Sequence, residues 1–477
     1  MRITPSPGNS ISVLLRHPNT AQAFAEVVRV IAESGGGIGP IEVTDCTTRS
    51  ITRRIAIDTT GGDHPDRIVA ALRGLAGIEV LDVYDRTFKL HEGGKLEVVS
   101  KVALRDSADL SMAYTPGVAR VCQAIHSRPS AARDYTIKRS TVAVLTDGSA
   151  VLGLGDIGAV AALPVMEGKA VLFKEFGKVD AFPVCVDTKD PEELLACARA
   201  VAATFGGINL EDIAAPKCFE IERRLTDAVD IPVFHDDQHG TAVVVGAAFI
   251  NAVKLTGKEP SKMRAVISGA GAAGVACTRA LYDLGIGDVI VCDRQGSIYR
   301  GRQGMNPAKE WLAQVSNAQN FKGTLQEALV GADLFLGVSG PNLLTGDDIR
   351  KMAQAPIVFA LSNPVPEVAP EAAAEYAAVV ATGRSDYPNQ INNVLCFPGL
   401  FRGLLECGAK RVTREMLTAA ARAIASVISE DELRPDFIIP SVFDKRVSES
   451  VAGAVVRVAS DPSAAQTPIY FDFAASR

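Results

Sequence analysis

One glycine-rich turn constrains the fold of this chain more than any other feature of its sequence. The apolar run "AVIS" leads into the spacing Gly269-x-Gly271-x-x-Gly274, and an Ala-rich run follows. The first glycine of such a turn permits a tight bend, the second lets the backbone approach a pyrophosphate, and the third lets helix and strand pack closely. This succession predicts the first unit of an α/β fold with a doubly wound parallel sheet that binds a dinucleotide.

The residues that follow the turn extend the prediction to the cofactor. Ala272 and Ala273 stand where the helix begins, so free N–H groups and the positive end of the helix dipole face the phosphates. Asp293 ends the next apolar run, 24 residues after Gly269, and is placed to accept a hydrogen bond from the ribose 2′-hydroxyl of NAD. Arg294 follows directly and would pair with the 2′-phosphate of NADP. The sequence favours NAD and leaves NADP open.

Length and composition set the number of domains and the class of protein. At 477 residues the chain exceeds what one hydrophobic core usually serves, so two or three domains are expected. The net charge of −6, with basic and acidic residues interspersed, argues against a nucleic-acid partner. The N-terminus has no apolar signal run, and no window approaches the length of a membrane span. These features favour a cytoplasmic protein.

The first 90 residues predict a separate small domain. Strands and helices alternate in the order β-α-β-β-α-β, with strands over 11–17, 38–46, 50–60 and 77–90 and helices over 18–34 and 64–75. This order is that of the ferredoxin-like split unit, and it resembles an ACT domain, a regulatory module that often binds amino acids between copies. The loop after the first strand lacks the glycine usual there. A small-molecule effector and a purely dimerising role both stay open.

The remainder of the chain predicts two larger parts and a tail. After the linker "HEGGKLEV" we expect a catalytic α/β domain over 95–242, a Rossmann-type domain over 243–460 and a C-terminal tail over 461–477. Asn363 ends a later apolar run, "APIVFALSNP", and the carboxyl ends of such strands form the ligand crevice. Asn363 therefore faces the nicotinamide in one interpretation and caps the turn before Pro364 in an equally good one.

Carboxylates gather in two short stretches of the predicted catalytic domain. Glu211 and Asp212 are adjacent in "GINLEDI", and Asp236 and Asp237 are adjacent in "PVFHDDQHG". Acidic pairs near buried apolar segments repel one another unless a cation neutralises them, and oxygen ligands suit Mg²⁺ or Mn²⁺. A helix cap at the second pair and a solvated face at the first explain the same residues equally well.

Lys169 stands in "MEGKAVLF", at the mouth of an apolar segment. Apolar walls and a nearby divalent cation would lower the pKa of its ammonium group, which makes a usable base near neutral pH. Taken alone, an ordinary surface lysine is the plainer interpretation.

A run of motifs resembles the successive signatures of malic enzymes, specifically the shorter bacterial type. They occur in unbroken order between about residues 95 and 460, as "AYTPGVA", "AVLGLGDIGAVAALPVMEGKAVLFK", "FGGINLEDI", "PVFHDDQHGTA", "GAGAAG", "FALSNP" and "NQINNVLCFPG". The resemblance implies oxidative decarboxylation of malate to pyruvate and carbon dioxide, with NAD or NADP and Mg²⁺ or Mn²⁺. It also implies a homodimer or a larger even oligomer.

Residue by residue, the resemblance assigns roles. It implies that Tyr114 is the general acid and Lys169 the general base. The metal ligands it implies are Glu211, Asp212 and Asp237, and the amides that hold substrate and nicotinamide ribose are Asn363 and one or both of Asn392 and Asn393. Longer eukaryotic malic enzymes have an arginine for a substrate carboxylate where this chain has Ala150, and Arg384 is a candidate substitute.

Two other functions stay open. A malolactic enzyme, which retains NAD and releases lactate, shares these motifs. A non-enzymatic sensor would combine the ACT-like module with the dinucleotide site, but it would not need the lysine, the tyrosine and the carboxylates together.

Overall fold

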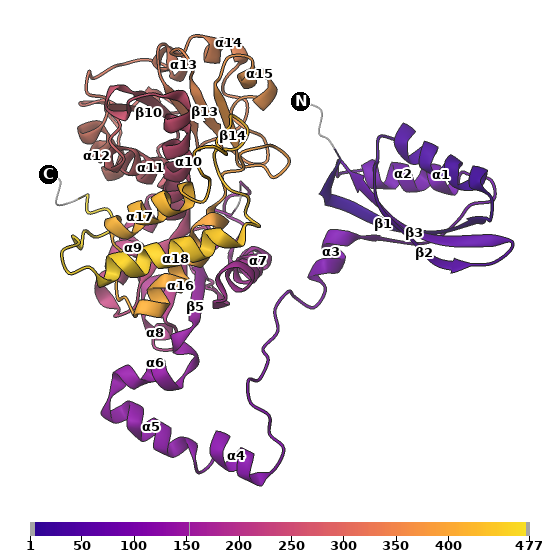
Figure 1. The fold of residues 1–477 in the computed structure, drawn as a ribbon, viewed down its shortest axis with the longest axis horizontal. Coiled ribbons are helices and arrows are strands. Elements are labelled where there is room, and N and C mark those ends of the chain that lie inside the picture. Colours follow the sequence, from indigo (N-terminus) through magenta and orange to yellow (C-terminus); the bar gives the residue numbers. More distant parts are fainter. Residues whose placement is uncertain (1–4, 152, 474–477) are drawn as a thin grey trace. The chain divides into compact units, whose positions relative to one another are not determined.

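The computed structural model describes residues 5–151 and 153–473. The chain divides into two compact units, Met1–Glu97 and Val98–Arg477 (Figure 1). Each unit has its own hydrophobic core.

The first unit is an antiparallel sheet with two helices packed on one face. Along β1, Ile11, Val13 and Leu15 alternate toward the helices and are almost fully buried. The sheet order is β2-β3-β1-β4. Its elements are β1 (Ser6–Pro18), α1 (Ala21–Glu33), β2 (Gly37–Cys46), β3 (Ser50–Thr59), α2 (His64–Arg73), β4 (Glu79–Asp85) and α3 (Arg86–His91).

The end of this unit differs from the sequence-based expectation. The sequence predicts one strand over 77–90, but β4 ends at Asp85 and the chain turns into the short helix α3. The Asp85 carboxylate accepts hydrogen bonds from the backbone N–H groups of Thr87 and Phe88, which is the usual side-chain cap of a helix start. The apolar alternation of the strand conceals this cap.

The second unit begins with short helices and a parallel sheet. The sheet order is β6-β5-β7-β8, and every residue of the central strand β5 is buried. The elements are α4 (Ser107–Ala113), α5 (Val118–Ser127), η1 (Pro129–Ala131), α6 (Ala132–Tyr135), η2 (Ile137–Arg139), β5 (Thr141–Thr146), α7 (Ala159–Gly177), β6 (Asp180–Cys185), α8 (Pro191–Val201), β7 (Gly207–Leu210), α9 (Lys217–Ala228), β8 (Val233–His235) and the π-helical turn η3 (Asp236–Gly240).

A second, doubly wound sheet follows. Its order is β11-β10-β9-β12-β13-β14, and all neighbours except the β10–β11 pair are parallel. The strand order reverses at β9, where such sheets bind ligands. The elements are α10 (Thr241–Thr256), η4 (Pro260–Lys262), β9 (Arg264–Ser268), α11 (Ala272–Asp283), β10 (Asp288–Asp293), β11 (Gly296–Ser297), α12 (Pro307–Val315), α13 (Leu325–Leu329), β12 (Leu334–Gly337), α14 (Gly346–Arg350), β13 (Ile357–Ala360), α15 (Pro370–Ala374) and β14 (Val379–Thr382).

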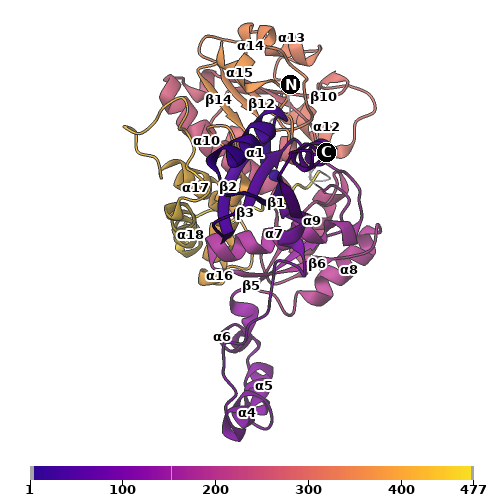
Figure 2. The same cartoon turned by 90° about the vertical axis from the view of Figure 1, so that its right-hand side faces the viewer.

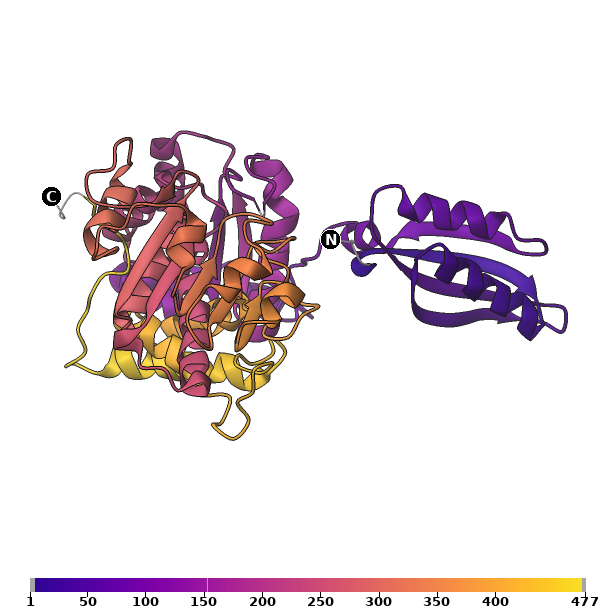
Figure 3. The ribbon, with the colours of Figure 1, turned by 90° about the horizontal axis from the view of Figure 1, so that it is seen from above.

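The C-terminal helices join the two sheets into one unit. They are preceded by η5 (Asn393–Leu395) and comprise α16 (Phe397–Cys407), α17 (Arg414–Ala425) and α18 (Lys445–Ser460). Helix α16 packs against α7 and α18, and α17 packs against α10 and α18. Figures 2 and 3 show these helices along one side of the unit. A continuous core therefore spans the boundary that the sequence predicts at 242/243.

Among the described residues, one helical segment, Asp236–Thr256, is long and apolar enough to cross a membrane by length and composition alone. In this fold, 72% of its most apolar window is buried inside the protein. Burial by neighbouring protein elements accounts for its apolar character, because a core helix surrounded by other elements is apolar on all sides.

Candidate active site

Acidic side chains follow three neighbouring strands at the carboxyl edge of the parallel sheet β6-β5-β7-β8. Asp147 follows β5, Glu211 and Asp212 follow β7, and Asp236 and Asp237 follow the edge strand β8. Because parallel strands end at the same edge, residues from distant parts of the sequence meet there.

Three of these carboxylates form one group. Glu211, Asp212 and Asp237 each place an oxygen within 4.8 Å of the others, and the backbone N–H of Asp212 donates to Asp237 Oδ2 at 2.9 Å. Over the part of the chain that the structure describes, no other group of His, Cys, Asp or Glu meets this criterion. An all-oxygen donor set of this kind fits Mg²⁺ or Mn²⁺.

The Lys169 ammonium group lies beside this group, in the middle of α7. It donates to Glu211 Oε1 at 2.8 Å and to Asp236 Oδ2 at 2.5 Å, and it lies 4.1 Å from the centre of the Phe397 ring. The residue is 8% exposed. The ammonium group contacts two of the four carboxylates, Glu211 and Asp236, so negative charge is left for a further cation to neutralise.

The pKa of Lys169 differs from expectation. Burial would lower this pKa, but the carboxylates of Asp236 and Glu211 more than offset burial and raise it above its ordinary value. Burial thus acts in the predicted direction, but Asp236 and Glu211 make the net change upward. Burial also raises the pKa of Glu211 well above its usual range, against the opposing effect of Lys169.

Two of the predicted amides, Asn392 and Asn393, lie at or next to the Lys169–Asp236 pair. Asn393 Nδ2 donates to Asp236 Oδ2 at 2.9 Å, so this amide contacts the carboxylate that also binds Lys169. The Asn392 side chain accepts a hydrogen bond from the backbone N–H of Val394 and thereby caps η5. Asn393 is thus part of the site, and Asn392 fixes the turn that carries it.

A buried carboxylate missed by sequence reasoning anchors η3. Glu222 of α9 is completely buried and accepts hydrogen bonds from His235 N at 3.1 Å, Gln238 Nε2 at 3.3 Å and His239 Nε2 at 2.9 Å. These donors flank Asp236 and Asp237 in the chain. The interactions with His239 and His235 hold the pKa of Glu222 below its ordinary value, although burial opposes them.

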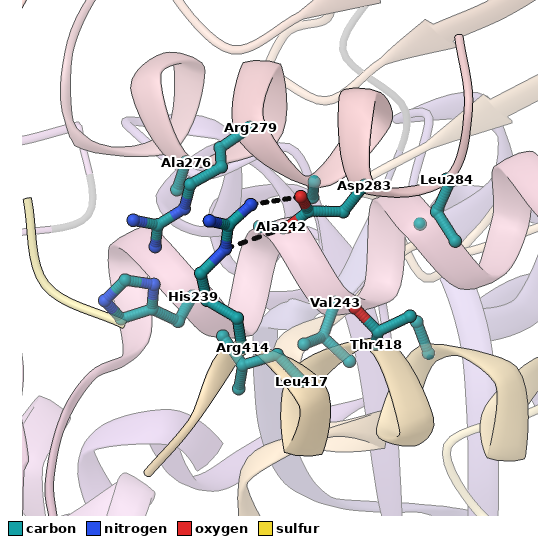
Figure 4. Close-up of a pocket in the computed structure, with 13 residues that line it drawn as sticks. His239, Ala242, Val243, Ala276, Arg279, Asp283, Leu284, Arg414, Leu417 and Thr418 are labelled. Carbon is teal, nitrogen blue, oxygen red and sulfur yellow. Dashed lines mark hydrogen bonds and ion pairs between the residues drawn. The ribbon is translucent and has the colours of Figure 1, made fainter. Parts of the chain in front are cut away.

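Helix α11 closes the other side of this turn. Figure 4 shows the Arg279 guanidinium group next to the His239 ring, and the Arg414–Asp283 ion pair beyond them. The Arg279 Cζ atom also lies 3.8 Å from the centre of the Phe471 ring. The segment that carries two site carboxylates is therefore held from both α9 and α11.

We expect Glu222→Gln to destabilise the protein by about 2 kcal/mol and to weaken Mn²⁺ binding, because an amide donor would face the N–H donors of η3. Urea unfolding and Mn²⁺ titration by calorimetry measure the two effects. Glu220→Gln is the matched control, since Glu220 lies on the same helix with an exposed side chain and should change neither. Equal behaviour of the two variants would contradict the anchoring role.

The glycine-rich turn lies between β9 and α11. Gly269 has a φ of +121°, and a Cβ there would lie 2.7 Å from Val338 O. A Cβ on Gly274 would lie 1.8 Å from Gly269 O, whereas one on Gly271 would meet nothing within 4 Å. The first and third glycines are thus required by local packing, and the second leaves the open approach that a pyrophosphate needs. Ala272 and Ala273 begin α11 as predicted.

Asp293 ends β10 but is already engaged by the protein. It pairs with Arg302 and Lys309, each at 2.7 Å, and these bonds lower its pKa although burial would raise it. Arg294, the predicted phosphate partner, is exposed, and the cations that reach Asp293 come from further along the chain. Sequence reasoning missed both, because they lie beyond the strand in a segment without periodic pattern.

Asn363 lies just beyond the carboxyl end of β13. Its amide approaches Gly383, where a Cβ would lie 2.6 Å from Asn363 Nδ2. Arg384, the candidate for the missing arginine, donates to Pro364 O at 3.1 Å and pairs with Asp386. Asn363 and Arg384 thus lie together beyond the carboxyl ends of β13 and β14.

Tyr114 does not lie with the other predicted catalytic residues. It caps the end of α4 and is 69% exposed. No residue of α4 or α5 is buried. In the described part of the chain, the hydrogen bonds and ion pairs of residues 98–128 all end within residues 98–134. Within one chain, the structure therefore shows no contact that brings this phenol to Lys169.

Two family models together match most of the second unit. The model of the "Malic enzyme, N-terminal domain" matches residues 93–226, and that of the "Malic enzyme, NAD binding domain" matches residues 238–460. Together they cover most of the chain. The chain belongs to the malic enzyme family.

Several bacterial malic enzymes are similar to most of this chain. An NAD-dependent malic enzyme of Geobacillus stearothermophilus is 52% identical over 94% of both chains. A bifunctional malic/malolactic enzyme of Bacillus subtilis is also 52% identical, over 79% of this chain and 92% of its own. An NADP-dependent malic enzyme of Salmonella typhimurium is 47% identical over 79% of this chain and 52% of its own.

Solved malic enzyme structures share the fold. The NAD-dependent malic enzyme of Thermotoga maritima has a TM-score of 0.76 and 46% identity, and the match covers 78% of this chain and 99% of that one. The malic enzyme of Entamoeba histolytica has a TM-score of 0.76 and 36% identity, covering 80% and 82%. Malic enzymes named for NAD and for NADP thus both resemble this chain, so similarity alone does not assign its cofactor.

Proposed function

We propose that this malic enzyme oxidises and decarboxylates (S)-malate to pyruvate and carbon dioxide while reducing NAD⁺ or NADP⁺, with Mg²⁺ or Mn²⁺. The observation that carries the proposal is the buried Lys169 ammonium group, hydrogen-bonded to a member of the three-carboxylate group. A proton acceptor beside a cation site is what oxidation of a hydroxy acid followed by loss of carbon dioxide requires.

Each residue has a defined task in this proposal. Glu211, Asp212 and Asp237 would hold the divalent ion, which supplies Lewis-acid stabilisation of the carbonyl and enolate oxygen when bound. Gly269, Gly271 and Gly274 would hold the nicotinamide cofactor, which would supply the hydride acceptor for carbon 2. Asn363, Asn392 and Asn393 supply or position amides for the substrate and the nicotinamide ribose.

Lys169 takes the hydroxyl proton of malate. To do so its amine must first be neutral, and Asp236 Oδ2, 2.5 Å from Lys169 Nζ, is an acceptor for the ammonium proton. Asn393 donates to the same oxygen, which keeps Asp236 aimed at the lysine. After carbon dioxide leaves, Tyr114 delivers a proton to carbon 3 of enolpyruvate.

A second copy of the chain supplies that tyrosine. The segment around Tyr114 exposes a run of apolar side chains, Val98, Val99, Val102, Leu104, Leu110, Met112 and Val121. Such a surface is typical of one covered by another protein. Homodimers are the commonest oligomers, and in a two-fold pair each copy would complete the other's site. The N-terminal unit would serve assembly or regulation, with a small-molecule effector as an open possibility.

Malate-dependent reduction of NAD⁺ and NADP⁺ tests the proposal. We expect purified protein with (S)-malate and Mn²⁺ to form reduced cofactor and pyruvate in equal amounts, and EDTA to abolish the reaction. Reduced cofactor formed from another 2-hydroxy acid but not from malate would contradict the substrate assignment. Lactate formed without net cofactor reduction would identify the malolactic reaction, and cofactor binding without turnover would identify a sensor.

A further inference from the structure

Two basic side chains attach the Tyr114 segment to the rest of its own chain. We call residues 98–128, which carry this tyrosine, the arm, and residues 129–139 connect the arm to β5. The structure describes all of residues 129–139, and the hydrogen bonds that reach from them beyond residue 140 come from the side chains of Arg133 and Lys138. The polar attachment of the arm therefore depends on these two cations.

Lys138 binds the end of α8 with its whole ammonium group. Its Nζ donates to the backbone carbonyls of Ala202 and Ala203, each at 2.9 Å, and to that of Phe205 at 2.8 Å. An ammonium group has three N–H donors, so these three bonds use all of them. The last carbonyls of a helix have no donor within the helix and carry the negative end of its dipole, which makes a cation the favourable partner.

Arg133 makes the equivalent contact at the end of α16. Its Nη2 donates to the backbone carbonyl of Leu405, in the last turn of that helix. Gly408 follows the helix with a φ of +69°, and a Cβ there would lie 3.5 Å from Arg133 Cζ, so the guanidinium group lies across the helix end. The two cations are also near each other, because Arg133 contributes, after burial, to the lowering of the pKa of Lys138. Two helix ends thus converge on one anchor, formed by Arg133 and Lys138.

This anchor lies at the opposite edge of the sheet from the metal-binding carboxylates. Lys138 precedes β5, whereas Glu211, Asp212 and Asp237 follow the carboxyl ends of neighbouring parallel strands. The six residues of β5 separate the two edges by about 17 Å. A local change at the anchor therefore leaves the carboxylate group in place and acts on the arm.

We propose that Arg133 and Lys138 are positioning residues, which fix the direction of the arm and so place Tyr114 in the site of a second copy. The inference rests on the proposed function, in which a second copy supplies the tyrosine, and adds the residues that set its position. Protonation of enolpyruvate requires the phenol within reach of carbon 3, and a misplacement of about 1 Å can cost about 10²-fold in rate. Loosening the anchor slows this step selectively.

Lys138→Ala with chemical rescue tests the proposal. We expect malate turnover to fall about tenfold and released enolpyruvate to rise, with Mn²⁺ affinity unchanged. Added propylammonium, which supplies the carbons and the ammonium group that the substitution removes, should restore most of the activity, whereas 1-propanol should not. Arg128→Gln is the matched control, because Arg128 pairs with Asp134 at 3.7 Å in an exposed position and should keep native kinetics.

A second variant and a second measurement keep the test decisive if Lys138→Ala folds poorly. Arg133→Gln should lower malate turnover about threefold, because one of the two attachments remains. Amide hydrogen exchange over residues 107–127 should be faster in both anchor variants than in Arg128→Gln, a result that does not depend on turnover.

Native turnover and native exchange in both anchor variants would overturn the inference. A loss of Mn²⁺ affinity equal to the loss of turnover would also overturn it, since the substitution would then act on the whole fold and not through the arm. If the native protein itself fails to oxidise malate, the proposed function fails, and the exchange measurement still decides whether Arg133 and Lys138 hold the arm.

Discussion

Lys169→Met is expected to lower the turnover of malate by about 10³-fold or more, because the side chain that takes the hydroxyl proton is removed while its volume is retained. Decarboxylation of added oxaloacetate should also fall, since the ammonium group orders Glu211 and Asp236. Steady-state kinetics with malate and with oxaloacetate measure both effects.

Lys174→Met is the control for this substitution. Lys174 lies on the same helix, α7, and pairs with Asp180 in an exposed position. It should keep native kinetics, because exposed ion pairs of this kind contribute little. Comparable losses in both variants would show that a charge on α7, and not the buried ammonium group, matters.

Tyr114→Phe is expected to slow malate turnover by about 10²-fold, because it removes the proton donor for enolpyruvate. Oxaloacetate decarboxylation should be affected less, since the loss of carbon dioxide precedes that protonation. Trapping of released enolpyruvate and its rate of ketonisation separate the two steps. An equal and mild loss in both reactions would contradict the assigned role.

Mixing the two inactive proteins tests where Tyr114 acts. If each copy lends its tyrosine to the other, a mixed dimer of Tyr114→Phe and Lys169→Met chains contains one site with both native residues. Random exchange of subunits should then restore about a quarter of the native activity. If the tyrosine serves its own chain, no mixed dimer has a native site, and activity stays absent.

Local spacing predicted the parts of the site that neighbouring residues build. The glycine turn was predictable because each glycine answers a contact within the same strand–turn–helix unit. The set of Glu211, Asp212 and Asp237 came from the resemblance to malic enzymes, since spacing alone left a helix cap and a solvated face equally open. The glycine turn depends on regular geometry that the residue pattern expresses directly.

Other parts depend on packing that no short pattern reports. Asp236 binds Lys169 across 67 positions of sequence, and Glu222 reaches η3 from a different helix. The pair Arg302 and Lys309 meets Asp293 from a segment without regular periodicity. Tyr114 was identified from the motif "AYTPGVA", but no pattern in the sequence indicates that its surroundings within one chain are exposed.

Binding of Mn²⁺ tests the central claim most directly, because it asks whether the group of Glu211, Asp212 and Asp237 is a cation site. Electron paramagnetic resonance of titrated Mn²⁺ should show a single tight site in the native chain. Glu211→Gln combined with Asp237→Asn should abolish that site, whereas Lys174→Met should keep it. Unchanged Mn²⁺ affinity in the double variant would contradict the account, since the ion would then bind elsewhere.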